Sequence, residues 1–497
     1  MLFAALSCLG ILRHEMWLDE LNTWLAARDS HSFARFLENT NYSGHRGIWD
    51  TLLYLFTRVT ANPAAMQVFS MLVSTITVVL FLKYSPFPAA YSIAIVFSYF
   101  FLYEYNIISR GYNLTWLLLV GYCILFTKPE RNYLMLMLIL MLLANIHLFS
   151  LVVSLPLFGI LIYSGARESA LNKRAILIYS LAFAVAIGIS LISSMPPANA
   201  PELLNGAKGL FTPDRFSKTV SFFVKGLYPL PDIHSPYFWN SNFLVVHFKI
   251  IAIIITPFLF AIPYILCYDR PLAVIFFYSA VLLVMAFMFT AELFTGVRYM
   301  GYAFMILLVT LWLAGDERLK TKKQSALLNK LRILAYKPFI TSVLVTQVAA
   351  GAYAIYKDYK YPFSEGKEVA AYIKSNAGQN GLIIVVPHSA GPSIAGYMDT
   401  GLFYYPDINT FTAYWNRIPL QQTSEQETFA RIQHTIDSLQ VNSFAIAVAT
   451  DYDSIGSLKA NIERVYNSDR YSIVEQKNFT GAIVRGENYT VYRVRRK

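Results

Sequence analysis

The chain has 497 residues, of which 56% are hydrophobic and only 14% are charged. Soluble domains carry about 25% charged residues, so this composition indicates long apolar segments and excludes an ordinary soluble protein. The formal net charge is +11, but the basic residues do not form one patch, so we expect no nucleic-acid partner. The three cysteines lie in or beside apolar stretches and form no readable disulfide or Cys-x-x-Cys metal motif.

Apolar stretches recur along the first 357 residues, and a helix that crosses the bilayer needs about 20 apolar residues in a row. We predict ten or eleven such helices, near residues 1–13, 64–83, 87–103, 113–127, 133–147, 149–164, 175–194, 246–267, 271–291, 298–314 and 338–356. The first stretch is short: either its helix is tilted or residues precede it. It lacks the basic start and A-x-A site of a cleaved signal peptide. The predicted fold class is an α-helical polytopic membrane protein with about 11 transmembrane helices.

Lysine and arginine are concentrated in one set of alternate loops. These cations are Lys83, Lys128, Arg131, Arg167, Lys173, Arg174, Arg270 and the run from Arg318 to Lys337. Because lysine and arginine favour the cytoplasmic side of a membrane, we place this set of loops in the cytoplasm. The expected location of the chain is the inner (plasma) membrane of the cell. The long segments 14–63 and 195–245 then lie outside, and eleven crossings put the C-terminal region outside too.

From about residue 358 the composition changes to that of a soluble domain. Amphipathic helices are predicted at residues 366–376 and 427–439, and strands at 381–389, 443–450, 471–479 and 490–497. The expected organisation is a membrane domain over residues 1–357 and an extracytoplasmic α/β domain over 358–497. No glycine-rich nucleotide-binding motif and no HExxH zinc motif is present, which argues against a nucleotide-driven pump or a zinc protease.

The two long outer segments are predicted to hold short helices. Residues 32–37 and 48–59 have apolar spacing typical of helices that lie in the membrane interface. The segment 195–245 is rich in proline and is expected to be irregular, except for a short amphipathic helix from Asp214 to Gly226.

The sharpest local feature is the acidic segment HEMWLDELNTWLAARDS, residues 14–30, which follows the first apolar stretch. Glu15, Asp19 and Glu20 stand where that helix leaves the bilayer. A carboxylate beside an apolar interface takes up a proton more readily and can act as a base. The structural alternative is a helix cap and a solvated acidic turn.

A second feature is FLYEYNIISRGYNLTW, residues 101–116, in a short outer loop. Glu104, Arg110 and Tyr112 are its candidate functional residues, because a fixed guanidinium can hold a phosphate through paired hydrogen bonds. The structural alternative is an interfacial arginine whose charge reaches water, flanked by tyrosines.

Three further outer positions carry polar groups: His147 in LLANIHLFSLVV, the pair Arg298 and Tyr299 in ELFTGVRYMGYAF, and His45 in GHRGIWDTLLYLF. Each alone is compatible with a packed histidine or an interfacial anchor. The topology was set only by basic loops, yet all of these residues fall on the outer face. Polar groups at such depth are costly and usually functional. Together they suit a substrate with a lipid tail, a phosphate and a polar group to be transferred.

In this order and topology the chain resembles the GT-C superfamily of polytopic glycosyltransferases. The resemblance is to the bacterial branch with the protein O-mannosyltransferase-like, aminoarabinose-transferase-like and RgtA/B/C/D-like enzymes. The matching elements are an Asp-Glu pair after the first helix, the small-residue turn GHRG, the loop ISRGYNL, Asn-x-His near helix five and Arg-Tyr opening a late helix. They are spread over residues 10–310. Relatives often have H/K-P-P-L-Y where this chain has His45-Arg46-Gly47-Ile48, which weakens the transfer of a role to His45.

The resemblance implies inverting transfer of a sugar from a polyprenyl-phosphate donor to a lipid, glycan or protein acceptor at the outer face of the membrane. Asp19 would be the general base, and Glu20 or Glu104 would orient the acceptor or hold Asp19. Arg110 and Arg298 would neutralise the lipid phosphate, and an apolar groove would hold the prenyl tail. The cations Lys208, Arg215, Lys218 and Lys225 are further candidates for substrate binding. A divalent metal occurs in some relatives, but the sequence requires no metal or other cofactor.

Two other functions are compatible with the sequence. A transporter or lipid flippase would carry ionisable residues near helix midpoints and repeated halves, and neither is visible. A non-catalytic scaffold for the assembly of cell-envelope glycans, with the C-terminal domain as a binding module, is the second alternative.

Overall fold

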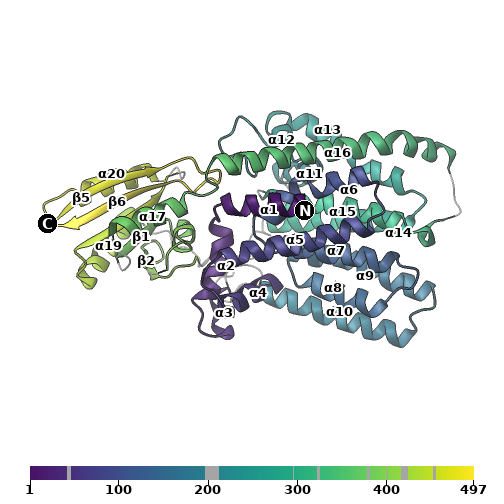
Figure 1. Cartoon of the computed structure of the whole chain (residues 1–497), viewed down its shortest axis with the longest axis horizontal. Coiled ribbons are helices and arrows are strands. Elements are labelled where there is room, and N and C mark those ends of the chain that lie inside the picture. The colour runs from purple at the N-terminus through teal and green to yellow at the C-terminus, as the bar shows by residue number, and fades with distance from the viewer. Residues whose placement is uncertain are drawn as a thin grey trace.

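The structure is a computed structural model of the chain. It describes residues 1–41, 46–195, 212–294, 296–321, 325–377, 381–399, 401–415, 424–450 and 455–497. A bundle of helices forms the larger part, and a small α/β domain at the C-terminus lies at one end of it (Figure 1).

Seven of the described helices are long and apolar enough to cross a membrane. They are α5 (Ala64–Tyr84), α9 (Leu148–Arg167), α10 (Lys173–Ser194), α13 (Lys249–Cys267), α14 (Pro271–Ala291), α15 (Val297–Ala314) and α16 (Ala326–Lys360). Three shorter apolar helices accompany them: α1 (Leu2–Arg13), α7 (Tyr112–Thr127) and α8 (Tyr133–Ala144). The prediction of a helical membrane protein is confirmed at this level, and the count of eleven crossings stays a prediction.

Two predicted helices differ from the structure. The stretch 87–103 is broken into α6 (Ala89–Val96) and the π-helix η1 (Tyr99–Ile107), all of whose residues are buried. A buried segment gives no amphipathic period, so its break could not be read from the sequence. α16 begins 12 residues before the predicted start at 338. The basic segment from Ala326 to Lys337 mixes apolar and charged residues, and it forms the first turns of the same helix.

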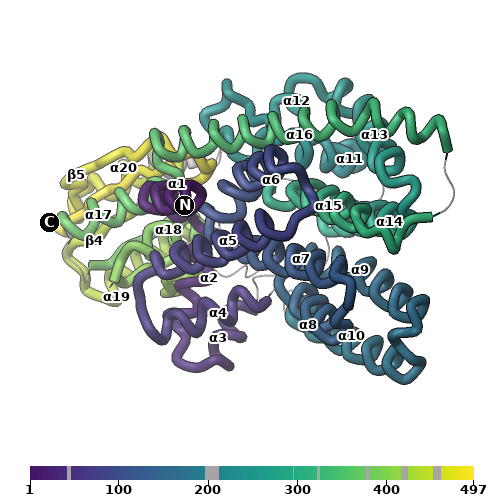
Figure 2. Tube along the Cα trace, turned by 45° about the vertical axis from the view of Figure 1, so that its right-hand side comes forward, coloured from purple at the N-terminus to yellow at the C-terminus, as the bar shows by residue number. Residues whose placement is uncertain are grey.

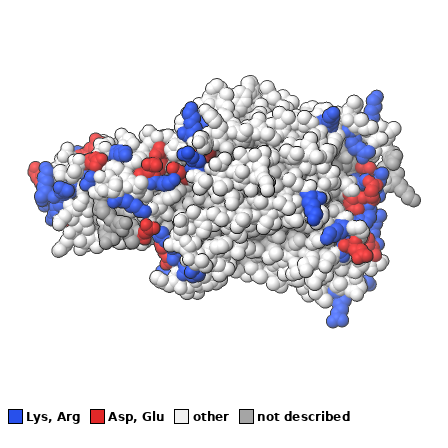
Figure 3. Space-filling view, viewed as in Figure 1, with Lys and Arg blue, Asp and Glu red and all other residues white. Residues whose placement is uncertain are grey.

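The basic loops gather at the end of the bundle far from the C-terminal domain. There Arg131 contacts Glu168 and Asp316, and Arg318 pairs with the same Asp316 at 2.8 Å. Figure 3 shows charged side chains at both ends of the molecule and a broad band between them that is mostly uncharged. This distribution matches the surface that a bilayer requires, since charges are expensive in its apolar core.

Short helices cover the other end of the bundle. They are α2 (Leu18–Arg28), α3 (Phe33–Asn39), α4 (Ile48–Thr57), α11 (Pro213–Leu227) and α12 (Phe243–His247). α3, α4 and α11 correspond to predicted helices, whereas α2 falls in the acidic segment 14–30, for which no such helix was predicted. α2 buries Leu21, Trp24 and Leu25, and Ser30 after it is buried as well, so its apolar side packs inward.

The C-terminal domain is built on one six-stranded sheet with the order β3-β2-β1-β4-β6-β5. Its strands are β1 (Leu382–Val386), β2 (Leu402–Tyr405), β3 (Thr410–Phe411), β4 (Ser443–Ala449), β5 (Tyr471–Phe479) and β6 (Tyr489–Arg496). β1 is parallel to β2 and β4, and the other pairs are antiparallel. The helices are α17 (Gly366–Ala377), α18 (Gly391–Ala395), α19 (Glu425–Leu439) and α20 (Ile455–Tyr466). The short β2 and β3, with α18 and α20, were not predicted.

The sheet domain shares a hydrophobic core with the outer helices. Leu21 and Trp24 of α2 belong to the same buried cluster as Ile394 of α18 and Val369 of α17. In Figure 2, α2 and α4 lie next to α18 at the base of the domain. The domain therefore rests directly on the helix that carries Asp19.

Candidate functional site

Asp19 is the centre of a three-residue ion cluster. Its Oδ2 lies 2.7 Å from Nη1 of Arg110 and 2.9 Å from Nη2 of Arg298. The three side chains are 14–22% exposed, so a ligand can reach them from outside. The cluster joins the first turn of α2, the loop before α7 and the first turn of α15, and it carries one more positive than negative charge.

Glu20, the next residue, is turned inward and is fully buried. Its Oε1 accepts a hydrogen bond from the backbone N–H of Ser109 at 2.7 Å, and its Oε2 lies 3.0 Å from Nε2 of His14. Nδ1 of His14 lies 2.7 Å from Oδ2 of Asp358, near the end of α16. Glu20 therefore fixes the loop next to Arg110 and does not face outward. This geometry suits a residue that holds its neighbours in place and not one that contacts an acceptor.

His14 is a buried cation between two carboxylates. Burial alone would lower the pKa of His14, but Asp358 and Glu20 outweigh it and raise the pKa to about 10. Glu15 beside it is different, because burial raises the pKa of its carboxyl to about 7 although Lys367, 4.0 Å away, and His14 oppose this. The sequence singled out neither His14 nor Asp358 as functional residues, because these two lie 344 positions apart.

Arg110 is fixed by its neighbours. The Ser109 amide is bound by Glu20, and the next residue, Gly111, is packed so closely that an added Cβ would lie 2.8 Å from Cβ of Trp49 in α4. Burial would lower the pKa of Arg110, but the carboxylate of Asp19 outweighs it and holds the pKa above its usual value. Arg110 is therefore a fixed positive charge.

Arg298 is fixed through its backbone. Its carbonyl accepts a hydrogen bond from the hydroxyl of Tyr105, and the N–H of Val297 donates to Oδ1 of Asn240 at 2.7 Å. Its guanidinium carbon lies 4.9 Å from the ring centre of Tyr299 and 5.8 Å from that of Trp17. Within the described residues, Nε of Arg298 and Nε1 of Trp17 are buried donors without a hydrogen-bond partner. Buried donors are normally satisfied, so both are available to an acceptor on a ligand.

Glu104 lies in η1 and is buried away from solvent. Its Oε2 accepts hydrogen bonds from the hydroxyl of Tyr99 at 2.8 Å and from Nε1 of Trp239 at 3.0 Å. Trp239 in turn packs edge-on against Trp17, with ring centres 4.8 Å apart. Glu104 therefore supports the wall behind Trp17 through two donors and, like Glu20, is placed as a positioning residue.

An aromatic group lines the other side of the cluster. The hydroxyl of Tyr112 lies 3.4 Å from Nε2 of His147, and the two ring centres are 5.1 Å apart. Tyr299 stacks on Phe149 at 4.8 Å, and its hydroxyl lies 3.4 Å from Nη2 of Arg298. Tyr112, His147 and Tyr299, all predicted from sequence, are thus brought to one place.

Several predicted residues are not part of this arrangement. Lys208 lies outside the described residues, Arg215 pairs with Glu292 at 3.1 Å, and Lys218 lines the same separate pocket as Lys225. His45 lies outside the described residues. Lys225, in α11, lines a separate pocket with residues of α12 and α13, and it makes none of the contacts of the Asp19 cluster in the part of the chain that the structure describes. Their role in substrate binding stays a prediction.

An apolar cavity of about 550 Å³ lies near His14 and Asp358. It is bounded by α1, η1 and α16, and its lining includes Leu6, Leu102 and Ile355, with Arg13 and Asp358 as its charged members. Gly10 lets α1 approach η1, since a Cβ there would lie 2.5 Å from Ile107. Such a cavity can hold a hydrocarbon chain.

Over the ranges that the structure describes, no group of three or more His, Cys, Asp or Glu side chains is placed to hold a metal ion. The arrangement instead supplies fixed cations and free hydrogen-bond donors around one carboxylate. Chemically it can bind an anion and accept a proton beside it.

The fold defines the class of this chain: it is a helical membrane protein, with a polar cluster at the end that carries a small α/β domain. Comparison with known proteins adds no narrower assignment, because no family model matches the sequence and no curated protein matches it either.

Proposed function

We propose that this chain is an inverting glycosyltransferase that moves a sugar from a polyprenyl-phosphate donor to an acceptor hydroxyl at the outer face of the membrane. One observation carries the proposal: Asp19 is bridged by Arg110 and Arg298 at 2.7 and 2.9 Å. A carboxylate that can accept a proton therefore lies in direct contact with two guanidinium groups that can bind a phosphate.

The proposed reaction uses these groups in one displacement. The carboxylate of Asp19 takes the proton of the acceptor hydroxyl as its oxygen attacks the anomeric carbon from the face opposite the phosphate. The bond between that carbon and the phosphate oxygen breaks, and its electron pair stays on the phosphate. Arg110 and Arg298 stabilise the negative charge that develops on the leaving phosphate, which is the electrostatic part of the catalysis.

Binding of the donor would also prepare the base. An incoming phosphate competes with Asp19 for Arg110 and Arg298, and the unsatisfied Nε of Arg298 and Nε1 of Trp17 supply two more donors. Once a guanidinium turns to the phosphate, the carboxylate of Asp19 can accept the acceptor proton. Glu20 and Glu104 keep α2 and Trp17 in place during this exchange.

The cavity between α1, η1 and α16 is the proposed place of the lipid chain. It is lined almost wholly by apolar side chains, and its lining includes Asp358, whose carboxylate contacts His14. His14 in turn contacts Glu20, the neighbour of Asp19. A chain held there would have its phosphate end at the same end of the bundle as the ion cluster.

The first prediction concerns Asp19→Asn, which keeps the shape and removes the base. Transfer should fall by at least 100-fold, since a positioned base contributes roughly 10²–10⁴, while expression and thermal unfolding stay near wild type. Transfer is measured with purified protein in nanodiscs supplied with a membrane lipid extract of the source cells, by mass spectrometry of the lipid-linked sugars consumed.

Asp29→Asn is the matched control. Asp29 ends the same helix and pairs with the neighbouring Arg28 at 2.7 Å, so its loss leaves the cluster intact and transfer should be unchanged. Near-normal transfer by Asp19→Asn would remove Asp19 from the role of base. Consumption of no lipid-linked sugar by the wild type would contradict the proposed activity itself.

A further inference from the structure

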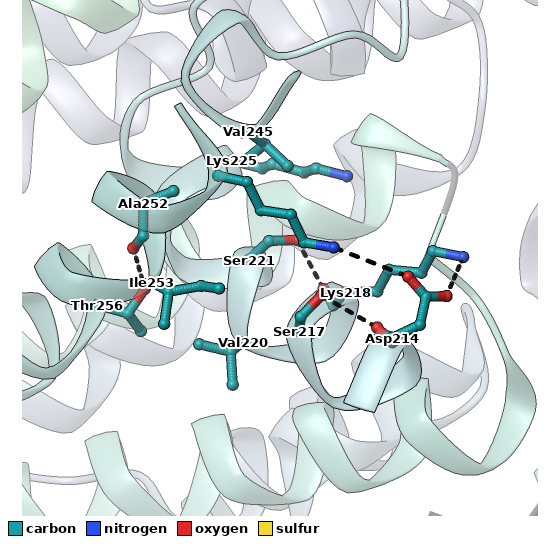
Figure 4. A pocket seen from close by; sticks show the side chains of 11 residues that line it. Asp214, Ser217, Lys218, Val220, Ser221, Lys225, Val245, Ala252, Ile253 and Thr256 are labelled. Carbon is teal, nitrogen blue, oxygen red and sulfur yellow. Dashed lines mark hydrogen bonds and ion pairs between the residues drawn. The ribbon is translucent and has the colours of Figure 1, made fainter. Parts of the chain in front are cut away.

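A second pocket lies between α11, α12 and α13, and it shares no lining residue with the Asp19 cluster. Its volume is about 200 Å³. Its lining is three lysines, one acid, three hydroxyl residues and four apolar residues: Lys218, Lys225, Lys249, Asp214, Ser217, Ser221, Thr256, Val220, Val245, Ala252 and Ile253. Figure 4 shows Asp214 and Lys218 on one side of the pocket and Ala252 and Ile253 of α13 on the other.

The charges in this pocket are unequal. Asp214 contacts Lys218 at 2.6 Å and Lys249 at 3.9 Å, so one carboxylate serves two ammonium groups. Lys225 has no carboxylate within ion-pair distance among the residues that the structure describes. Three cations and one anion leave an excess of two positive charges around one small space.

Lys225 is only partly exposed, which makes its isolation from acids more significant. Burial lowers the pKa of Lys225, and the neighbouring Lys218 lowers it further. Both effects disfavour the ammonium form of Lys225. An anion bound between the lysines would oppose both effects, because it stabilises the ammonium form.

The surroundings of the pocket are those of a membrane surface. α12 and α13 present large apolar side chains outward next to it, including Val246 (58% exposed), Ile250 (74%) and Ile254 (59%). α13 itself is one of the helices that can cross a membrane. An anion bound by these lysines would therefore lie beside exposed apolar side chains of α12 and α13.

From these observations we infer that the pocket binds the phosphate of an anionic membrane lipid. The lysines hold the phosphate, and the hydrocarbon chain continues along Ala252, Ile253 and Thr256 of α13 into the bilayer. This site is additional to the ion cluster of Asp19, and it does not depend on the proposed sugar transfer.

The second prediction tests this site on the full-length protein in detergent. Binding of dioleoyl phosphatidic acid, whose headgroup is a bare phosphate, is measured by native mass spectrometry beside dioleoyl phosphatidylcholine and inorganic phosphate. Phosphatidic acid should bind most tightly, and Lys225→Gln should weaken it by about fivefold, since one cation near a lipid phosphate contributes that much. Lys173→Gln, at an exposed lysine that begins α10, should leave binding unchanged.

Two further variants make the result independent of folding. Lys225→Arg keeps the charge and should retain binding. Asp214→Asn frees Lys218 and Lys249 and should strengthen binding, an effect that damage to the fold would not produce. Equal binding by wild type and Lys225→Gln would overturn the proposal. Inorganic phosphate that binds as tightly as the lipid would overturn its assignment to a lipid. Loss of sugar transfer in Asp19→Asn bears on neither result.

Discussion

Single residues decide what the polar end of this membrane protein can do. Asp19 and Glu20 are neighbours in sequence, yet one faces the solvent-accessible ion cluster and the other is buried against His14 and Ser109. A helix turns about 100° per residue, so adjacent acids point to different sides. One acid is left for chemistry and the other for support.

The third prediction concerns His14 and pH. Because Asp358 and Glu20 raise its pKa from 6.5 in the unfolded chain to about 10, the folded protein binds this proton more tightly. Its stabilisation is complete below pH 6.5, declines as the pH rises above that value and is lost near pH 10. Glu15 also has a raised pKa, of about 7, so its titration changes the stability at lower pH. Most of the loss of stability between pH 7 and pH 10 therefore comes from His14.

The measurement is the thermal unfolding temperature of wild type and His14→Gln between pH 7 and 10.5. The wild-type temperature should fall across this range, while the variant should be lower at pH 7 and depend less on pH. Removing the cation leaves two buried carboxylates unpaired, a loss of about 3 kcal/mol. His31→Gln, at an exposed histidine, serves as the control. Parallel pH curves for wild type and His14→Gln would refute a charged His14.

At the scale of elements, the site depends on how closely a loop can approach a helix. The residues Ser109 to Gly111 run between α2 and α4, fixed on one side by Glu20 and on the other by Trp49. The N–H of Ile48, which begins α4, donates to the carbonyl of Asn145 at 2.9 Å, so α4 is itself tied to the end of α8. The position of Arg110 thus follows from several helix ends together.

The fourth prediction is that Gly111→Ala destabilises the protein by about 1–3 kcal/mol, since a methyl group forced into a packed site displaces its neighbours. The new Cβ would lie 2.8 Å from Cβ of Trp49, and moving either group shifts Arg110. Transfer should fall more than stability alone explains. Gly121→Ala in α7, whose Cβ would meet nothing closer than 3.6 Å, should cost little. Unfolding temperature and transfer rate report both effects, and equal behaviour of the two variants would argue against a tight loop.

Much of the membrane part follows from the sequence, because apolar stretches of sufficient length have few alternatives to a helix in a bilayer. The strands of the C-terminal domain that alternate or are wholly apolar were likewise predictable. The helix α2 was not predictable, since its segment places the acids Asp19 and Glu20 beside three apolar residues and resembles a solvated turn. The pairing of Asp19 with Arg110 and Arg298 could only be anticipated as a shared face, because the packing of helices far apart in sequence decides which side chains meet.

On the scale of the whole molecule, the C-terminal domain is fastened to the start of α2. Glu487 is buried and accepts hydrogen bonds from the hydroxyls of Ser364 at 2.6 Å and Ser393 at 2.8 Å, and from the N–H of Leu18 at 3.3 Å. A carboxylate at a helix N-terminus is favourable, because the first amides have no partner within the helix. The domain therefore holds the turn that presents Asp19.

The hydroxyl of Tyr489 is a fourth donor to Glu487, at 3.1 Å. The fifth prediction is that Glu487→Gln loosens this attachment, since its amide cannot accept from all four donors and each lost hydrogen bond to a charged group is worth about 1.5–3 kcal/mol. Hydrogen exchange of the amides at the start of α2 should become faster, and transfer should decrease. Glu475→Gln, at an acid of β5 that pairs with Arg493 of β6 at 3.0 Å, should change neither. Unaltered exchange in Glu487→Gln would show that the domain does not fix α2.

The length of α16 sets a further relation between the two ends. Its 35 residues correspond to about 52 Å of helix, whereas the apolar layer of a bilayer is about 30 Å thick. This rod starts among the basic residues of the far end, and Asp358 in its last turn contacts His14. This single helix therefore sets the distance between the basic end of the bundle and the sheet domain. Under the proposed function, an acceptor would reach Asp19 at the end of the bundle where that domain is held.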